Sequence, residues 1–119
     1  MNQDNYVTQP MAQRLVDAGF VLDTEAVWFH FKGGWELLHR NWNDYIHIDL
    51  IPAPSFAELW RELPEETQIK ECGRVPLLMW KEDKLFCCCY GSDTNEIWFG
   101  EKRSTNPADA LAELLIWTK

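Results

Sequence analysis

The chain has few of the features that mark several large functional classes. Basic residues are scarce: Lys and Arg number 11 against 19 Asp and Glu, which gives a formal net charge of -8 over 119 residues. Because binding to phosphates needs clustered cations, we expect no direct nucleic-acid binding and no docking to an anionic membrane. No apolar run approaches the length of a membrane-spanning helix. These absences predict a protein partner rather than a nucleic acid or a lipid surface.

Sequence motifs of catalysis are also missing. The chain contains no G-x-S-x-G, no H-E-x-x-H and no dinucleotide-binding fingerprint. Gly33 and Gly34 stand alone, without the lysine and the following helix of a phosphate-binding loop, and indicate a hairpin turn instead. We therefore predict a protein that is not an enzyme, has no catalytic residues and needs no cofactor.

The cysteines do not have the spacing of a disulfide framework. Three of the four are consecutive, and neighbours on a strand point to opposite faces; the four are Cys72, Cys87, Cys88 and Cys89. Reduced thiols of a cytoplasmic protein fit this pattern better. The polar start MNQDNYVTQP, which does not resemble a signal peptide, supports the same expectation.

A metal site is the alternative interpretation of these cysteines. Cys87 and Cys89 share one face of a strand, and Cys72 or a histidine (His30, His39 or His47) could complete a tetrahedral zinc site. The short paired spacing of zinc sites is absent, however, and free cysteine is commonly a small buried apolar residue. We predict no metal ligands, and a small metal- or thiol-dependent enzyme stays as an alternative.

Three segments have helix-start chemistry. Thr8 and Pro10 open the first, which Gly19 ends. Ser55 and Glu58 form a capping box at the start of the second. The third follows Asn106 and Pro107 and runs through NPADALAELLIWTK.

The third expected helix is apolar almost all the way round. Only Asp109 and Glu113 form a polar stripe, while the other positions are mostly alanine, leucine, isoleucine or tryptophan. Such a helix must be covered on most sides, by its own sheet or by a second chain. This requirement is the main argument for an expected homodimer.

Strand-like segments lie between the helices in two groups. Residues 27–32 and 35–40 flank the Gly33-Gly34 turn, and residues 45–51 alternate between apolar and polar positions. The second group comprises residues 77–81, 85–90 and 96–99. The pattern predicts a single α+β domain over residues 1–119, in the order αβββαβββα. We expect three helices and one antiparallel sheet of about five to six strands in two meanders.

An aromatic patch on the first meander is the best candidate for an interaction surface. If Val27, Phe29 and Phe31 face the helices, the alternate positions face away and leave an apolar surface. Its predicted members are Trp28, His30, Trp35, Trp42, Tyr45 and His47. The alternative is that the second meander or a loop covers this face.

Two blocks, IPAPSFAELWRELPE at residues 51–65 and NPADALAELLIWTK at residues 106–119, suggest a relationship. They resemble a group of short, uncharacterised proteins of bacterial and phage genomes, in which a P-A-P-[ST] helix start precedes E-L and an N-P-A-D-A-L helix closes the chain. The resemblance implies a small α+β domain of phage-related type, and it supplies no catalytic residues that could be assigned to this chain.

The function that these observations favour is a non-enzymatic protein-interaction module of a phage or prophage. A second hypothesis is an acidic inhibitor that mimics nucleic acid and blocks a host defence or nucleic-acid-handling protein. Clustering of five carboxylates on one face would favour the inhibitor; these are Glu58, Glu62, Glu65, Glu66 and Asp109.

Overall fold

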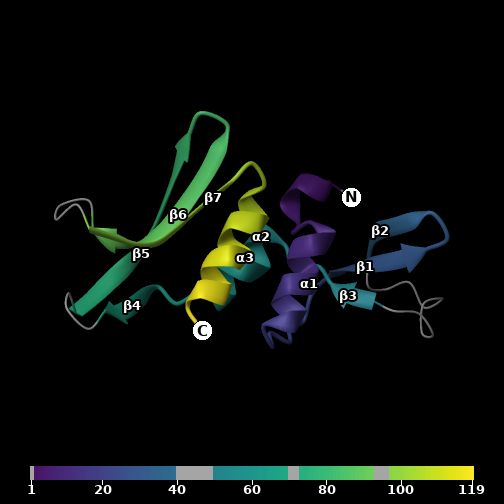
Figure 1. Cartoon of the computed structure of the whole chain (residues 1–119), viewed down its shortest axis with the longest axis horizontal. Coiled ribbons are helices and arrows are strands. Elements are labelled where there is room, and N and C mark those ends of the chain that lie inside the picture. The colour runs from purple at the N-terminus through teal and green to yellow at the C-terminus, as the bar shows by residue number, and fades with distance from the viewer. Residues whose placement is uncertain (1, 40–49, 70–72, 93–96) are drawn as a thin grey trace.

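Two antiparallel sheets lie at opposite ends of the molecule, with helices between them (Figure 1). The computed structural model describes residues 2–39, 50–69, 73–92 and 97–119. The elements are η1 (Gln3–Asn5), α1 (Gln9–Asp17), β1 (Ala26–Phe31), β2 (Gly34–His39), β3 (Leu50–Pro52), α2 (Phe56–Glu62), β4 (Glu66–Ile69), β5 (Gly73–Glu82), β6 (Leu85–Ser92), β7 (Ile97–Ser104) and α3 (Pro107–Trp117).

The three predicted α-helices are confirmed, and two of their caps are formed as expected. In α2 the Glu58 N–H donates to Ser55 Oγ over 3.1 Å, and the Ser55 N–H donates to Glu58 Oε1 over 2.8 Å. In α3 the Asp109 N–H donates to the Asn106 side chain over 3.1 Å. Thr8 precedes α1 but does not cap it with its own side chain.

The expected single sheet is wrong, although the α+β class and the antiparallel pairing are confirmed. The described strands form a three-stranded sheet in the order β2-β1-β3 and a four-stranded sheet in the order β4-β5-β6-β7. β4 was not predicted, because Glu66, Thr67 and Gln68 give a short edge strand no apolar alternation. β5 and β7 are also longer than the sequence pattern indicated.

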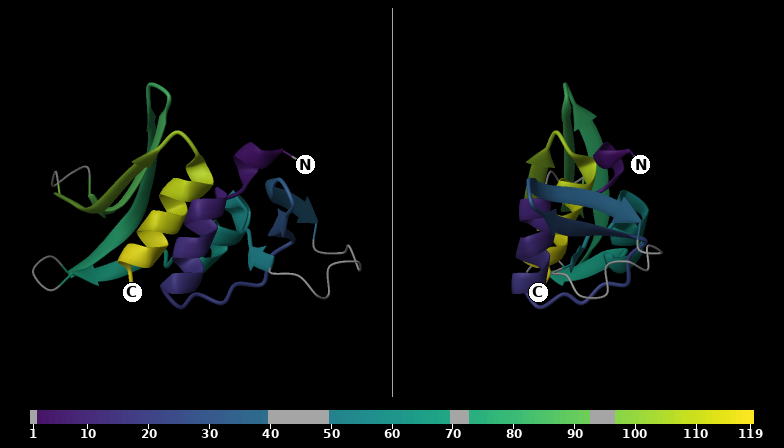
Figure 2. Two further views of the ribbon diagram at one scale, coloured as in Figure 1. Left: turned by 45° about the vertical axis from the view of Figure 1, so that its right-hand side comes forward. Right: turned by 90° about the vertical axis from the view of Figure 1, so that its right-hand side faces the viewer.

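The apolar helix α3 lies in the middle of the molecule, between the four-stranded sheet and the other helices (Figure 2). Its six buried residues are Ala108, Ala110, Leu111, Ala112, Leu114 and Leu115. Strands β6 and β7 cover one side, and α2 and α1 cover others. One chain therefore provides the cover that the sequence required, and α3 does not need a second copy.

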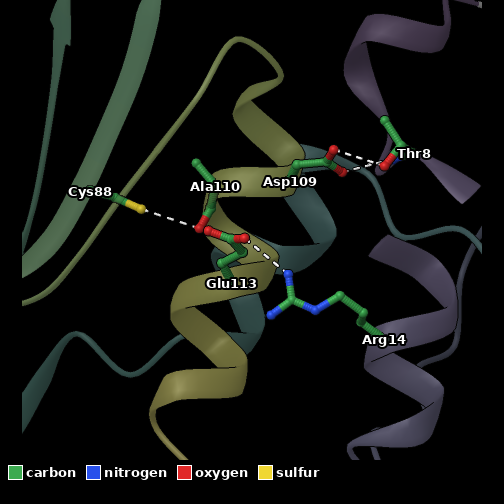
Figure 3. A network of polar contacts seen from close by, with 6 residues as sticks. All are labelled: Thr8, Arg14, Cys88, Asp109, Ala110 and Glu113. Carbon is green, nitrogen blue, oxygen red and sulfur yellow. Dashed lines mark hydrogen bonds and ion pairs between the residues drawn. The ribbon is translucent and has the colours of Figure 1, made fainter. Parts of the chain in front are cut away.

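Polar contacts join α3 to α1 on the side away from the four-stranded sheet (Figure 3). The Thr8 N–H and hydroxyl each donate to Asp109 over 2.8 Å, and Arg14 pairs with Glu113 over 2.9 Å. Burial raises the pKa of Asp109 above its ordinary value, although the two bonds from Thr8 act in the opposite direction. These contacts fix the position of α1 against the central helix.

The molecule is elongated, with extents of 51 × 30 × 19 Å and a radius of gyration of 15.7 Å. A compact domain of this length would have a radius of gyration of about 13.5 Å. The difference arises because the two sheets pack on opposite sides of the helices and not on each other (Figure 1). Each sheet consequently has one face turned away from the helical layer.

A β-bulge in β7 fits the end of α3 to the four-stranded sheet. Between the pairs Cys88–Lys102 and Tyr90–Phe99, one residue of β6 lies opposite two residues of β7. Gly100, in this bulge, has φ +68°, and a Cβ atom there would lie 2.5 Å from the Trp117 ring. Trp117 also stacks on Tyr90, with ring centroids 6.1 Å apart. Glycine is therefore required both by the backbone and by the packing of Trp117.

Candidate interaction surface

The predicted aromatic patch on the first meander is not arranged as expected, because Trp28 faces the core. Trp28 lies opposite Leu37 and Ile51 in the neighbouring strands, and all three belong to the main core cluster. Its indole N–H donates to the Val7 carbonyl over 2.9 Å. This bond removes the cost of burying a polar indole. Trp28 is 8% exposed and is unsuited to a surface role.

The other predicted members of this patch have different outcomes. His30 is exposed and its ring lies 4.9 Å from that of the half-buried Trp35. Trp42, Tyr45 and His47 lie outside the described residues. The prediction that this meander binds a partner therefore stays untested. Trp28 alone is removed from the predicted patch, because it is buried.

A second aromatic surface lies on the four-stranded sheet, on the face turned away from α3, which we call the outer face. Cys88 and Tyr90 belong to the core that contacts the helices, so the alternate residues Cys87 and Cys89 lie on the outer face. Leu78 and Trp80 of β5 lie opposite these two cysteines, and thus share the same face. In Figure 1 no labelled helix covers this side of the sheet.

Strand β7 completes the outer face. Arg103 lies opposite Cys87, and Trp98 lies opposite Gly91. The exposed fraction of Trp98 is 47%. Together β5 and β7 border a hollow of about 440 Å³, which we call the outer hollow; its lining residues are Leu78, Met79, Trp80, Trp98, Glu101 and Arg103.

The charges at the outer hollow form a small network around one cation. Arg103 contacts Glu82 at 3.1 Å and Glu101 at 3.4 Å. The hydrogen bond to Glu101, together with the charges of Glu101 and Glu82, raises the pKa of Arg103. Two carboxylates against one guanidinium leave this end of the face with an excess of negative charge.

The three consecutive cysteines of β6 are buried and form no disulfide. Cys87, Cys88 and Cys89 have no exposed area, which confirms the interpretation of these residues as small core residues. Burial raises the pKa of Cys87, and burial raises the pKa of Cys88 to about 12. The Cys88 thiol also donates to the Ala110 carbonyl over 3.4 Å (Figure 3). Cys87 and Cys88 are therefore protonated near neutral pH and are not activated nucleophiles.

On the helix side of β5 lies a second hollow, of about 490 Å³, which we call the inner hollow. It is lined by Trp60, Arg61, Leu63, Glu65 and Leu77. Trp60 is 45% exposed, so α2 presents an aromatic side chain beside the strand. β5 is consequently bordered by apolar side chains on both of its faces.

A third hollow, of about 760 Å³, is polar and lies between α2 and the segment before β1. Its lining residues are Leu22, Asp23, Thr24, Glu25, His39, Glu58, Arg61 and Glu62. Glu58 has a structural role here, because one of its carboxylate oxygens completes the capping box and the other accepts the Glu25 N–H over 3.0 Å. The hollow combines four carboxylates with one arginine.

The metal site that was considered for the cysteines does not form within the described parts of the chain. In those parts, no three His, Cys, Asp or Glu side chains are grouped so that they could hold an ion. Cys72 and His47 lie outside the described residues.

Sequence reasoning did not single out the outer face. The segment of residues 77–81 was predicted as a strand, but nothing in its alternation indicated that Leu78 and Trp80 are on the face without helices. A usable signal was Trp98, since the neighbouring Phe99 packs against the core and the alternate position then faces away from it.

Comparisons with known proteins give no relatives for this arrangement. A scan against protein-family models, a search of curated proteins and a search of solved structures each gave no match. Among the described residues, none of the helices is long and apolar enough to span a membrane.

Proposed function

We propose that this protein is a non-enzymatic interaction module that binds another protein through the outer face of its four-stranded sheet. The observation that carries the proposal is the group of apolar side chains around the outer hollow. Trp98 is 47% exposed and Met79 is 37% exposed, and the half-buried Leu78 and Trp80 line the same hollow. Contiguous apolar surface with a polar rim is typical of protein-binding sites, and tryptophan often supplies much of the binding energy.

The arrangement of the thiols favours binding over catalysis. Burial raises the pKa of Cys87 and of Cys88; Arg103, opposite Cys87, acts to lower the pKa of Cys87 but is outweighed, and it pairs with Glu101. A thiol-dependent enzyme would need a thiolate beside a base or a cation that stabilises it. We therefore keep the metal- or thiol-dependent enzyme as the less supported alternative.

Cellular setting and assembly are proposals that rest on the sequence. Three cysteines that form no disulfide, Cys87, Cys88 and Cys89, suit a reducing compartment such as the cytoplasm, and the two helix blocks support a phage-related protein. A homodimer remains a prediction, but its main argument is weaker because α3 is buried within one chain. Light scattering on the purified protein at micromolar concentration measures this directly.

The acidic inhibitor has one observation in its favour, the polar hollow with Asp23, Glu25 and Glu62. The five carboxylates named for it do not act as one group, however. Asp109 bonds Thr8, Glu58 caps α2, and Glu66 lies 3.9 Å from Arg74. Loss of partner binding in the double variant E25Q/E62Q, with full binding in Trp98→Ala, would support the inhibitor instead of the module.

The test of the proposed function compares two exposed apolar residues. We expect Trp98→Ala to reduce retention of a protein partner from a host lysate at least tenfold, because it removes the aromatic wall of the outer hollow. Val21→Ala is the matched control, since Val21 is 96% exposed and does not line this hollow. Equal retention by both variants would contradict the proposal.

A further inference from the structure

Strand β5 has an open edge beside the outer face. β4 pairs with β5 only from Gly73 to Pro76, and the Leu77 N–H donates to the Glu65 carbonyl over 2.9 Å. On the same side, none of the described strands pairs with the next five residues, Leu78–Glu82. In Figure 1 this stretch lies in the β5–β6 hairpin, beyond the end of β4.

The backbone groups that face this edge follow from the alternation of an antiparallel ladder. Glu82 and Leu85 flank the two-residue Asp83-Lys84 turn and form its closing hydrogen-bonded pair. Counting back from Glu82, the backbone groups of Trp80 and Leu78 therefore also bond to β6. The backbone groups of Met79 and Lys81 point away from β6, as do those of Leu77, whose N–H donates to the Glu65 carbonyl. Their N–H and C=O groups point to the open edge.

Apolar side chains border this edge on both faces of the sheet. On the helix side, Leu77 and the exposed Trp60 line the inner hollow, at the start of the open stretch. On the outer side lie Leu78 and Trp80, beside the outer hollow. Successive side chains of an added strand would point alternately to these two sides. Strand addition of this kind takes affinity from main-chain bonds and specificity from pockets for alternate side chains.

The charges near the edge favour a cationic strand. Glu65 lies at one end of the open stretch, and Glu82, which shares Arg103 with Glu101, lies at the other; Lys81 is the one cation within it. The whole chain has a net charge of -8. A segment with basic residues at its ends and apolar residues between them complements both features.

A second copy of the chain fits this edge poorly. In the antiparallel register that places Met79 opposite Lys81 of a second copy, Asp83 of that copy falls opposite Leu77. Glu65 already occupies this place, because its carbonyl accepts the Leu77 N–H. The other symmetric registers place Lys81 opposite either itself or the already bonded Leu77. Both copies would also have a net charge of -8.

From this geometry we infer that the edge of β5 at Leu78–Glu82 binds an extended, net-positive segment of a partner protein, which adds to the four-stranded sheet as a further strand. The inference rests on the proposed function, since it names the partner class of that surface. It adds the requirement that the bound segment pairs with the backbone of Met79 and Lys81.

The experiment selects peptides from a random twelve-residue display library on the purified full chain. We expect the enriched peptides to be net-positive, to alternate apolar residues and to lack internal proline. Each selected peptide is then synthesised and titrated against wild type and variants by isothermal calorimetry. Met79→Pro removes one edge-facing N–H and no bond to β6, and should weaken binding at least tenfold. Met79→Leu keeps the N–H and an apolar side chain, and should bind within twofold of wild type.

A second readout does not depend on how well the proline variant folds. In wild type, the bound peptide should slow amide hydrogen exchange at Met79 and Lys81 at least tenfold, with little change at Leu78 and Trp80. The same peptide with N-methyl groups on its pairing residues should lose this protection. Replacing its basic residues by glutamate should weaken binding at least tenfold.

The possible results separate this inference from the function on which it rests. Peptides that lose affinity with Trp98→Ala but bind Met79→Pro normally, without protecting Met79 and Lys81, would overturn strand addition and leave the outer face as the binding site. Enrichment of acidic peptides would overturn the charge requirement. Concentration-dependent protection of both amides without peptide would show that a second copy occupies the edge. No enrichment would contradict both proposals.

Discussion

The four-stranded sheet has two long edges that differ in chemistry. Along β7 the edge has a bulge at Gly100 and then three consecutive charged residues, from Glu101 to Arg103. Along β5 the open edge at Leu78–Glu82 begins with Leu78, Met79 and Trp80, and β5 has no bulge against β6. Bulges and charges are devices by which natural sheets prevent unwanted pairing of edge strands.

This difference shows that the sheet is protected against pairing with another chain along β7 but less so along the open stretch of β5. β4 covers the first half of β5, and β7 protects itself by its bulge and charges. The stretch from Leu78 to Glu82 instead begins with three apolar residues, Leu78, Met79 and Trp80, which line the outer hollow, and ends with Lys81 and Glu82. The partner strand inferred above would cover the three apolar residues of this stretch.

The largest predicted effect comes from breaking the protected edge. Gly100→Ala should lower the free energy of unfolding by about 2–4 kcal/mol, because a Cβ atom would clash with Trp117 in a backbone conformation that favours glycine. Urea denaturation followed by tryptophan fluorescence measures this change. Gly33→Ala is the control, since a Cβ atom there meets nothing within 4 Å. Equal stability of the two variants would show that the bulge does not depend on glycine.

Alkaline pH should weaken β6, the strand to which both edges are joined. Burial raises the pKa of Cys88 and that of Tyr90 to about 12, from ordinary values of 9.0 and 10.0. The folded state therefore holds these protons more tightly than the unfolded state. Their contribution is complete below about pH 9 and is lost as the pH rises toward 12.

The Cys88→Ala variant isolates one part of this pH dependence. It should lose stability less steeply than wild type between pH 9 and 12, by about 3 kcal/mol over that interval. Thermal or urea unfolding at several pH values measures the slope. Parallel curves for wild type and variant would contradict the burial of this thiol against Ala110.

The smallest predicted effect concerns the charges of the protected edge. Arg103→Ala should lower the free energy of unfolding only slightly, because its pairs with Glu82 and Glu101 are partly exposed and weakened by solvent. The difference from wild type should disappear in about 1 M salt, where screening is strong. A larger, salt-independent loss would mean that Arg103 is a structural residue and not only an edge charge.

The sequence predicted the helices well because their boundaries depend on local chemistry. Ser55 with Glu58, and Asn106 with Pro107, determine where α2 and α3 begin, and both caps are formed. The alternation of the cysteines was also informative, since Cys88 faces α3 and Cys87 faces the other side. These features depend on residues that are close together in the chain.

The division into two sheets and the buried face of β1 could not be predicted, because they depend on contacts distant in sequence. Val27, Trp28 and Phe29 are all buried, so the alternation in β1 did not indicate which face meets the helices. The bond from Trp28 to Val7 decides this, across 21 positions of the chain. The open edge of β5 likewise depends on where β4 ends, and β4 has no apolar pattern.

Amide hydrogen exchange of the free protein at low concentration tests the central claim most directly. If the β5 edge is open, the amides of Leu78, Trp80 and Glu82 should exchange slowly, and those of Met79 and Lys81 should exchange at least tenfold faster. Uniformly slow exchange across all five residues in a dilute monomer would show that the edge is already paired, and the docking surface proposed for this protein would not exist.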